Sequence, residues 1–116
     1  MKLAIIGSRT FNDYQLLKNE INDLVQKEKF EITHIVSGGA KGADKLGELY
    51  AFEYKIPTEI YYPDWSKGKG AGFERNHDII KNSDIVICFW NGESKGTLHS
   101  INLTKKYDKK CFIVKI

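Results

Sequence analysis

Short apolar runs alternate with longer amphipathic segments along this chain. Runs of this length that end at glycine, proline or polar residues are typical of buried strands. They cover Lys2–Ile6, His34–Val36, Thr58–Tyr62, Asp84–Trp90 and Lys110–Ile116. Between them, apolar residues recur at helical spacing, which predicts four helices. The first follows a cap at Asn12 or Asp13, the second runs from Ala43 to Tyr54, and the others cover Phe73–Lys81 and Thr97–Tyr107, with Pro63–Gly72 as a loop.

The regular alternation of strands and helices indicates the fold class. Strand–helix–strand units are joined by right-handed crossovers, and they build a parallel sheet that is covered on both faces. We therefore expect an α/β, Rossmann-like, doubly wound parallel sheet of five strands with helices on both faces. The 116 residues fit one domain spanning 1–116, and we find no internal repeat, linker or low-complexity tract.

Glycine is distributed one-sidedly. All but one of the ten glycines lie between a predicted strand and the helix that follows it, namely Gly7, Gly38, Gly39, Gly42, Gly68, Gly70, Gly72, Gly92 and Gly96. Strand-to-helix loops of a parallel sheet emerge at one edge, where open α/β sheets bind ligands. Glycine there lets backbone amides approach a phosphate, and a helix N-terminus adds free N–H groups. The exception, Gly47, lies within a helix, where close packing on the sheet explains it.

Four motifs at this edge carry polar groups suited to a phosphorylated ligand. They are Gly7-Ser8-Arg9-Thr10, Ser37-Gly38-Gly39-Ala40-Lys41-Gly42-Ala43-Asp44, Arg75-Asn76 and Trp90-Asn91-Gly92-Glu93-Ser94-Lys95-Gly96-Thr97. Arginine binds phosphate bidentately, and hydroxyl groups donate to it. The second motif has the form of a phosphate cradle, although it matches neither the Walker loop nor the dinucleotide fingerprint. Asp44 would either complement the helix dipole or bind a ribose hydroxyl, and Lys41 would face either solvent or ligand.

The predicted binding residues follow from these motifs and from aromatic residues near strand ends. Tyr62, Trp65, Phe11 and Trp90 are placed to stack on a base, and we expect one or two of them to touch the ligand. We expect Arg75 to be an exposed pocket arginine, and a valine at Gly39 to intrude where a phosphate meets the backbone. The binding set is Gly7, Ser8, Arg9, Thr10, Ser37, Gly38, Gly39, Ala40, Lys41, Gly42, Asp44, Trp65, Arg75, Asn76, Trp90, Asn91, Gly92, Ser94, Gly96 and Thr97.

The net charge and the positions of the histidines and cysteines limit the kinds of ligand and partner that we expect. The 18 basic and 15 acidic residues give a net charge of +3, and a lysine-rich stretch around Lys105–Lys110 lies toward the opposite edge from the glycines. This balance disfavours a nucleic-acid partner. The three histidines show no zinc spacing, so we expect no metal and no cofactor. Cys88 and Cys111 lie in apolar runs and are expected as free thiols of a cytoplasmic protein without a membrane span.

Taken together, the four motifs resemble those of the SLOG superfamily of Rossmann-like domains, and most closely its small, single-domain YspA-like branch. The resemblance covers nearly the whole chain. It implies binding of nucleotides or nucleotide-derived signals, including ADP-ribose-type molecules, by a sensor, carrier or sequestering protein. Some relatives act in bacterial antiviral signalling, and the superfamily suggests a dimer or higher homo-oligomer.

This sequence differs from the enzymes of the superfamily at positions of their catalytic pattern. LOG-type phosphoribohydrolases carry an Arg-Lys pair and a later glycine-rich motif that ends in a catalytic glutamate. Here Asn76 replaces the lysine, Asn91 stands where proline is expected, and Ser100 takes the glutamate position. We therefore expect binding without this hydrolase chemistry. Two alternatives stay open: a nucleotide-cleaving enzyme that uses Glu93, Asp44 or Asp64, and single-stranded DNA binding of the DprA type.

Overall fold

Five strands and four α-helices alternate along the chain in the computed structural model, which describes residues 1–116. The strands are β1 (Lys2–Gly7), β2 (His34–Ser37), β3 (Thr58–Ile60), β4 (Ile85–Trp90) and β5 (Lys110–Lys115). The α-helices are α1 (Tyr14–Glu28), α2 (Ala43–Glu53), α3 (Ala71–Lys81) and α4 (Lys95–Lys106), and a short 3₁₀ helix, η1, covers Trp65–Lys67.

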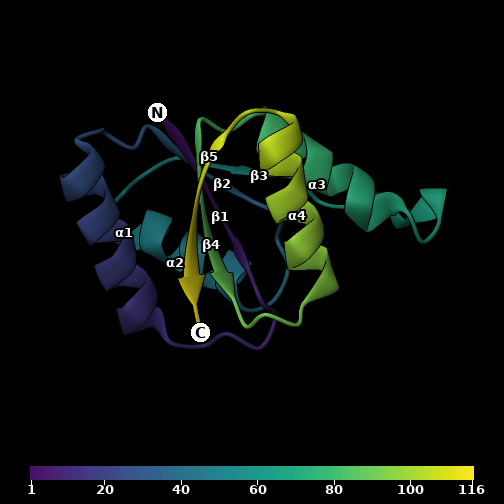
Figure 1. The fold of residues 1–116 in the computed structure, drawn as a ribbon, viewed down its shortest axis with the longest axis horizontal. Helices are drawn as coiled ribbons and strands as arrows, with labels where there is room; N and C mark the ends of the chain where they lie inside the picture. Colours follow the sequence, from purple (N-terminus) through teal and green to yellow (C-terminus); the bar gives the residue numbers. More distant parts are fainter.

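The strands form one parallel sheet in the order β3-β2-β1-β4-β5. Helices α1 and α2 cover one face of this sheet, and α3 and α4 cover the other (Figure 1). The predicted five-stranded, doubly wound α/β fold is therefore confirmed. Strand order reverses between β1 and β4, where Gly7 is in register with Phe89. In open α/β sheets, ligands bind in the crevice that such a reversal opens at the carboxyl ends of the strands.

Alternate side chains of β1 enter two separate cores. Leu3 and Ile5 pack with the α1 and α2 side chains, whereas Ala4 and Ile6 pack with those of α3 and α4. Gly47 of α2 lies directly on the first core, because a Cβ at this position would come within 2.9 Å of the Ile5 Cβ atom. The absence of a side chain brings α2 close to the central strand, as the sequence predicts for this glycine.

Helix α1 begins where expected, whereas α3 and α4 begin earlier. Asp13 caps α1 as predicted, since its carboxylate accepts from the Leu16 amide at 3.1 Å. By contrast, α3 begins at Ala71 and α4 at Lys95, each two residues before the predicted start. In α4 the reason is Ser94, whose hydroxyl accepts from the Thr97 amide at 3.3 Å. An N-cap of this kind satisfies a donor that the helix leaves free.

Four further observations concern the end of β3, the cysteines, membrane spans and metal-ligating residues. Strand β3 ends at Ile60 rather than at Tyr62. Cys88 and Cys111 are both free, and burial raises the pKa of each thiol. None of the helices is long and apolar enough to cross a membrane. No three metal-ligating side chains come together.

Candidate functional site

Two adjoining cavities lie at the carboxyl ends of β1, β2 and β4. The inner pocket is lined by Ile6, Gly7, Arg9, Ala40, Asp44, Arg75, Asn76, Ile79, Ser94, Gly96, Thr97 and Ser100. The outer pocket is lined by Arg9, Gly38, Gly39, Ala40, Lys41, Tyr62, Pro63, Trp65 and Arg75. With the space that opens to solvent, they measure about 440 Å³ and 720 Å³. Both pockets border Arg9, Ala40 and Arg75.

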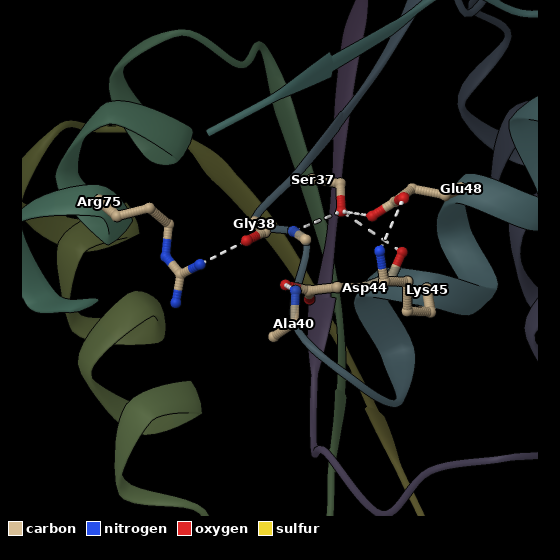
Figure 2. A network of polar contacts seen from close by, with 8 residues as sticks. Ser37, Gly38, Ala40, Asp44, Lys45, Glu48 and Arg75 are labelled. Atoms are coloured by element: carbon tan, nitrogen blue, oxygen red, sulfur yellow. Dashed lines mark hydrogen bonds and ion pairs between the residues drawn. The ribbon is translucent and has the colours of Figure 1, made fainter. Parts of the chain in front are cut away.

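Arg75 connects the two pockets and is fixed by the protein itself. Its Nη1 donates to the Gly38 carbonyl (Figure 2), and its Nε donates to Oδ1 of Asn76 at 3.1 Å. The residue is only 9% exposed, so the expectation of an exposed arginine is wrong. It lies under the loop that follows β2 instead. Burial lowers the pKa of the guanidinium, which nevertheless stays charged.

Asp44 is the one carboxylate that lines either pocket. It lies in the first turn of α2, and its Oδ2 atom accepts from the Ala40 amide at 3.2 Å (Figure 2). Burial raises the pKa of this carboxyl from 3.8 to about 6, against the opposing effects of the Ala40 amide and Arg75. A buried acceptor of this kind suits a ligand hydroxyl better than a phosphate, because two anions repel each other.

The loop after β2 depends on glycine for its shape. Gly39 has φ of +70°, and a Cβ there would lie 2.5 Å from the Tyr62 ring. A valine at Gly39 would strike the Tyr62 ring and so disturb the loop itself, while its clash with a phosphate stays a prediction. Gly42 has φ of +79°, and a Cβ there would strike the Ser8 carbonyl. Both glycines therefore fold the loop against its neighbours, and Gly39 also lines the outer pocket.

The N-terminus of α4 supplies free amides to the inner pocket. The Lys95 and Gly96 amides donate no hydrogen bond, and Leu98 donates the first intrahelical one, to the Ser94 carbonyl. A Cβ at Gly96 would meet no atom within 4 Å, so a ligand can approach the backbone there. Free amides and the positive end of the helix dipole together favour an anion.

The outer pocket combines aromatic and cationic side chains. Tyr62 and Trp65 are 66% and 60% exposed, far more than apolar packing requires. Arg9, Lys41 and Arg75 line the same pocket, and no carboxylate does. Exposed rings beside cations are the elements with which proteins bind bases and phosphates of nucleotides.

The structure brings part of the predicted set together. The predicted residues that line a pocket are Gly7, Arg9, Gly38, Gly39, Ala40, Lys41, Asp44, Trp65, Arg75, Asn76, Ser94, Gly96 and Thr97. The others, Ser8, Thr10, Ser37, Gly42, Trp90, Asn91 and Gly92, line neither. Several of these hold the loops: the Ser37 hydroxyl donates to Glu48 (Figure 2), and Oδ1 of Asn91 accepts from the Glu93 and Ser94 amides.

A few pocket residues were not predicted as binding residues. Ile6, Ile79 and Pro63 line the pockets with apolar atoms. Ile6 lies in β1 and Ile79 in α3, where an apolar residue indicates core packing equally well, and Pro63 lies in a loop, where proline is typical of a turn, so the sequence does not separate these roles from ligand binding. Tyr62 and Ser100 also line a pocket. Both stand out in the sequence, the first as an aromatic residue and the second at the family's glutamate position.

A solved structure of DNA processing protein A (DprA) from Helicobacter pylori, described for its single-stranded DNA binding mode, is similar to this fold. The two share 25% identity with a TM-score of 0.66, over 97% of this chain and 64% of the DprA chain. This chain therefore spans less than two thirds of that relative. The prediction that disfavoured nucleic acid is wrong, because a similar protein of this fold binds it. Net charge averages over the whole surface and misses the cations gathered at one pocket.

A curated relative and a family model complete the comparison. The Gene 61 protein of Mycobacterium phage D29 is 28% identical over 112 residues, covering 90% of this chain and 89% of the phage protein. The sequence model of the YspA, cpYpsA-related SLOG family matches residues 1–68. This match covers more than half of the chain and confirms the resemblance drawn from the motifs. The chain therefore belongs to the YspA, cpYpsA-related SLOG family.

Proposed function

We propose that this protein binds a phosphorylated nucleotide, with the phosphate in the inner pocket and the base in the outer one. The observation that carries the proposal is Arg75, which borders both pockets and takes part in none of the four ion pairs of the protein. Buried charges are normally paired. A buried guanidinium without an ion pair, beside two open pockets, therefore favours an anionic ligand.

Each part of a nucleotide has a matching group in this arrangement. The phosphate would lie between Arg75, Arg9 and the free amides of α4. The carboxylate of Asp44 would accept from a sugar hydroxyl. The base would stack on Tyr62 or Trp65, an interaction worth about 1–3 kcal/mol per base.

The family resemblance favours a small nucleotide-derived molecule, such as an ADP-ribose-type or cyclic nucleotide signal, which the protein would sense, carry or sequester. The homo-oligomer and the role in antiviral defence that the same resemblance implies stay predictions.

Mass spectrometry of the small molecules that heat releases from the purified protein would test this proposal. Calorimetry with AMP and ADP-ribose would follow. We expect Arg75→Ala to weaken binding about ten- to a hundredfold, the effect of one charge-assisted contact. Lys109→Ala, which removes a cation at the opposite edge of the sheet, is the matched control and should bind normally. Absence of binding by the unmodified protein to any phosphorylated nucleotide would contradict the proposal.

A second candidate is binding of a nucleotide that is part of single-stranded DNA. The cations and exposed rings of the outer pocket favour it, as does the similarity to the DNA-binding DprA. In that case an oligothymidylate should bind more tightly than dTMP, and its affinity should fall steeply with salt. Equal affinities for dTMP and the oligonucleotide would favour the small-molecule ligand.

A further inference from the structure

Arg75 is connected, through its neighbour Asn76, to an imidazole that lines neither pocket. Oδ1 of Asn76 accepts from Nε of Arg75 at 3.1 Å, and Nδ2 of Asn76 lies 3.3 Å from Nδ1 of His99. Asn76 is itself buried, with 9% exposure. These contacts link α3 to α4: Arg75 and Asn76 line the inner pocket, and His99 lies outside it.

The chemistry of these groups fixes where the protons are. An arginine Nε can only donate, so the Asn76 atom that faces it must be the carbonyl oxygen. The other Asn76 atom is then the amide nitrogen, which can also only donate. His99 must accept this bond at Nδ1, so Nδ1 carries no proton. The imidazole is therefore neutral, with its proton on Nε2.

The surroundings of His99 favour the neutral ring. Phe73 contacts it edge-on, with the ring centres 4.6 Å apart, and His77 follows at 5.7 Å. Burial and the nearby His77 hold the pKa of His99 below its usual value. On α4 the nearest charged residue along the helix is Lys95, one turn earlier, and no carboxylate bonds to the ring. On α3, Glu74 and Asp78 line a surface pocket with His77, and neither bonds to the His99 ring, so no carboxylate directly stabilises a proton on His99.

We propose that His99 is a positioning residue: its uncharged ring holds Asn76, Asn76 holds Arg75, and a proton gained by His99 releases Arg75 and weakens anion binding in the inner pocket. This inference rests on the proposed phosphate site. A protonated Nδ1 would face the Asn76 amide nitrogen, donor against donor. Asn76 would have to turn its amide, and Arg75 would then lose the acceptor for its Nε.

Two other effects act in the same pH range. The Asp44 carboxyl, with its pKa of about 6, gains a proton on acidification and thereby removes a negative charge from the pocket. A positive charge on His99 would also attract an anion from a distance. Both effects strengthen anion binding in acid, whereas release of Arg75 weakens it. The sign of the pH effect therefore separates the proposal from simple electrostatics.

The test uses inorganic sulfate, which keeps its charge through this range, and compares the protein with three variants. His99→Asn keeps an acceptor near the position of Nδ1 but does not titrate. His99→Leu has no acceptor, and His77→Asn removes the other histidine while leaving Asn76 in contact with His99. The ratio of affinities between the unmodified protein and His99→Asn cancels the effect of Asp44.

We expect this ratio to fall about tenfold between pH 7.5 and pH 5, the scale of one charge-assisted hydrogen bond. His99→Leu should bind sulfate weakly at every pH, and His77→Asn should retain the loss in acid. An unchanged ratio, or one that rises in acid, would overturn the proposal.

Nitrogen NMR of the ligand-free protein tests the contact chain without any ligand. The Arg75 Nε–H signal should shift and exchange faster with water as His99 titrates, and it should stay constant in His99→Asn. If sulfate binds at no pH, the proposed phosphate site is contradicted. The role of His99 in holding Arg75 is then tested by the NMR experiment alone. An Arg75 signal that ignores the titration of His99 would then overturn that role.

Discussion

The Arg75 guanidinium and the Asp44 carboxylate converge on the Cα atom of Gly38. A Cβ at Gly38 would lie 2.8 Å from Nη1 of Arg75 and 2.8 Å from Oδ2 of Asp44. The closeness of these two side chains thus depends on the missing side chain of one glycine. Because both groups also line the inner pocket, this glycine sets the spacing between its cationic side and its acceptor side.

Gly38→Ala should therefore damage binding and folding together. The added methyl group must displace Arg75 or Asp44, which are both buried. We expect at least a tenfold loss of nucleotide affinity and a loss of about 1–3 kcal/mol in the free energy of unfolding, as overpacking typically costs. Calorimetry and urea unfolding measure the two effects. Gly70→Ala, where a Cβ meets nothing within 4 Å, is the control. Normal affinity in Gly38→Ala would contradict the prediction.

Gly96→Ala should weaken ligand binding without lowering the stability of the protein. A Cβ at Gly96 contacts no protein atom, and alanine favours helix over glycine by about 1 kcal/mol, so stability should hold or rise. The methyl group would nevertheless stand beside the free amides of α4, where we propose the phosphate. We expect weaker binding of AMP and of inorganic phosphate without a fall in melting temperature. Unchanged affinity would move the phosphate away from this helix.

Trp65→Ala should weaken binding of a base but not of a bare phosphate. Trp65 is 60% exposed, so its removal should cost little stability. Loss of stacking should reduce the affinity for AMP or an oligonucleotide by about 1–3 kcal/mol and leave the affinity for inorganic phosphate unchanged. Phe52→Ala removes a ring that is 83% exposed and lines neither pocket, so it serves as the control. Equal effects of the two substitutions on AMP binding would argue against stacking at Trp65.

The sequence predicts the fold and the edge of the sheet where both pockets lie, because both depend on local signals. Apolar runs ending at glycine, proline or polar residues identify the strands, and the glycines in the loops after them identify one edge of the sheet. The burial of Arg75 is not predictable in this way, because it depends on a loop that lies 37 residues away in sequence and supplies the Gly38 carbonyl.

A second limit of sequence analysis explains why some predicted site residues line neither pocket. Serine and asparagine at loop positions can serve a ligand or the loop itself, and sequence does not distinguish the two uses. Asn91 accepts from two amides of its own loop, and Ser8 accepts from the Asn91 amide at 3.3 Å. The early start of α4 does have a sequence signal, since Ser94 is a good N-cap residue.

Asp44 should make stability depend on pH in an unusual direction. Its pKa is raised by burial from 3.8 to about 6, so the folded protein binds this proton more tightly than the unfolded chain. The resulting stabilisation is complete below pH 3.8 and is lost as the pH rises through 6. The gap between the two pKa values corresponds to about 3 kcal/mol. Asp44→Asn, which cannot ionise, should therefore be more stable than the unmodified protein at pH 7.

Urea unfolding from pH 3.5 to pH 7.5 measures this difference. The curves of the two proteins should meet near pH 3.5 and separate as the pH rises toward neutrality. Glu93→Gln, at an exposed carboxylate that lines neither pocket, is the matched control and should leave the pH dependence unchanged. Parallel curves for Asp44→Asn and the unmodified protein would show that Asp44 ionises normally in the folded state.

Finally, we expect the unmodified protein not to release free base from nucleoside monophosphates with multiple turnover. Ser100 lines the inner pocket where LOG-type hydrolases carry glutamate, and a hydroxyl neither stabilises an oxocarbenium-like state nor activates water as a carboxylate does. Loss of such a group typically costs about 10²–10⁴-fold in rate. Chromatography of reactions with a panel of nucleoside monophosphates measures base release, and Ser100→Glu should recover a trace at most, because Asn76 and Asn91 also differ from the hydrolase pattern. Robust turnover would favour the enzyme alternative instead. Asp44, the one carboxylate that lines the pocket, would then be the acid or base, and Asp44→Asn should abolish the turnover.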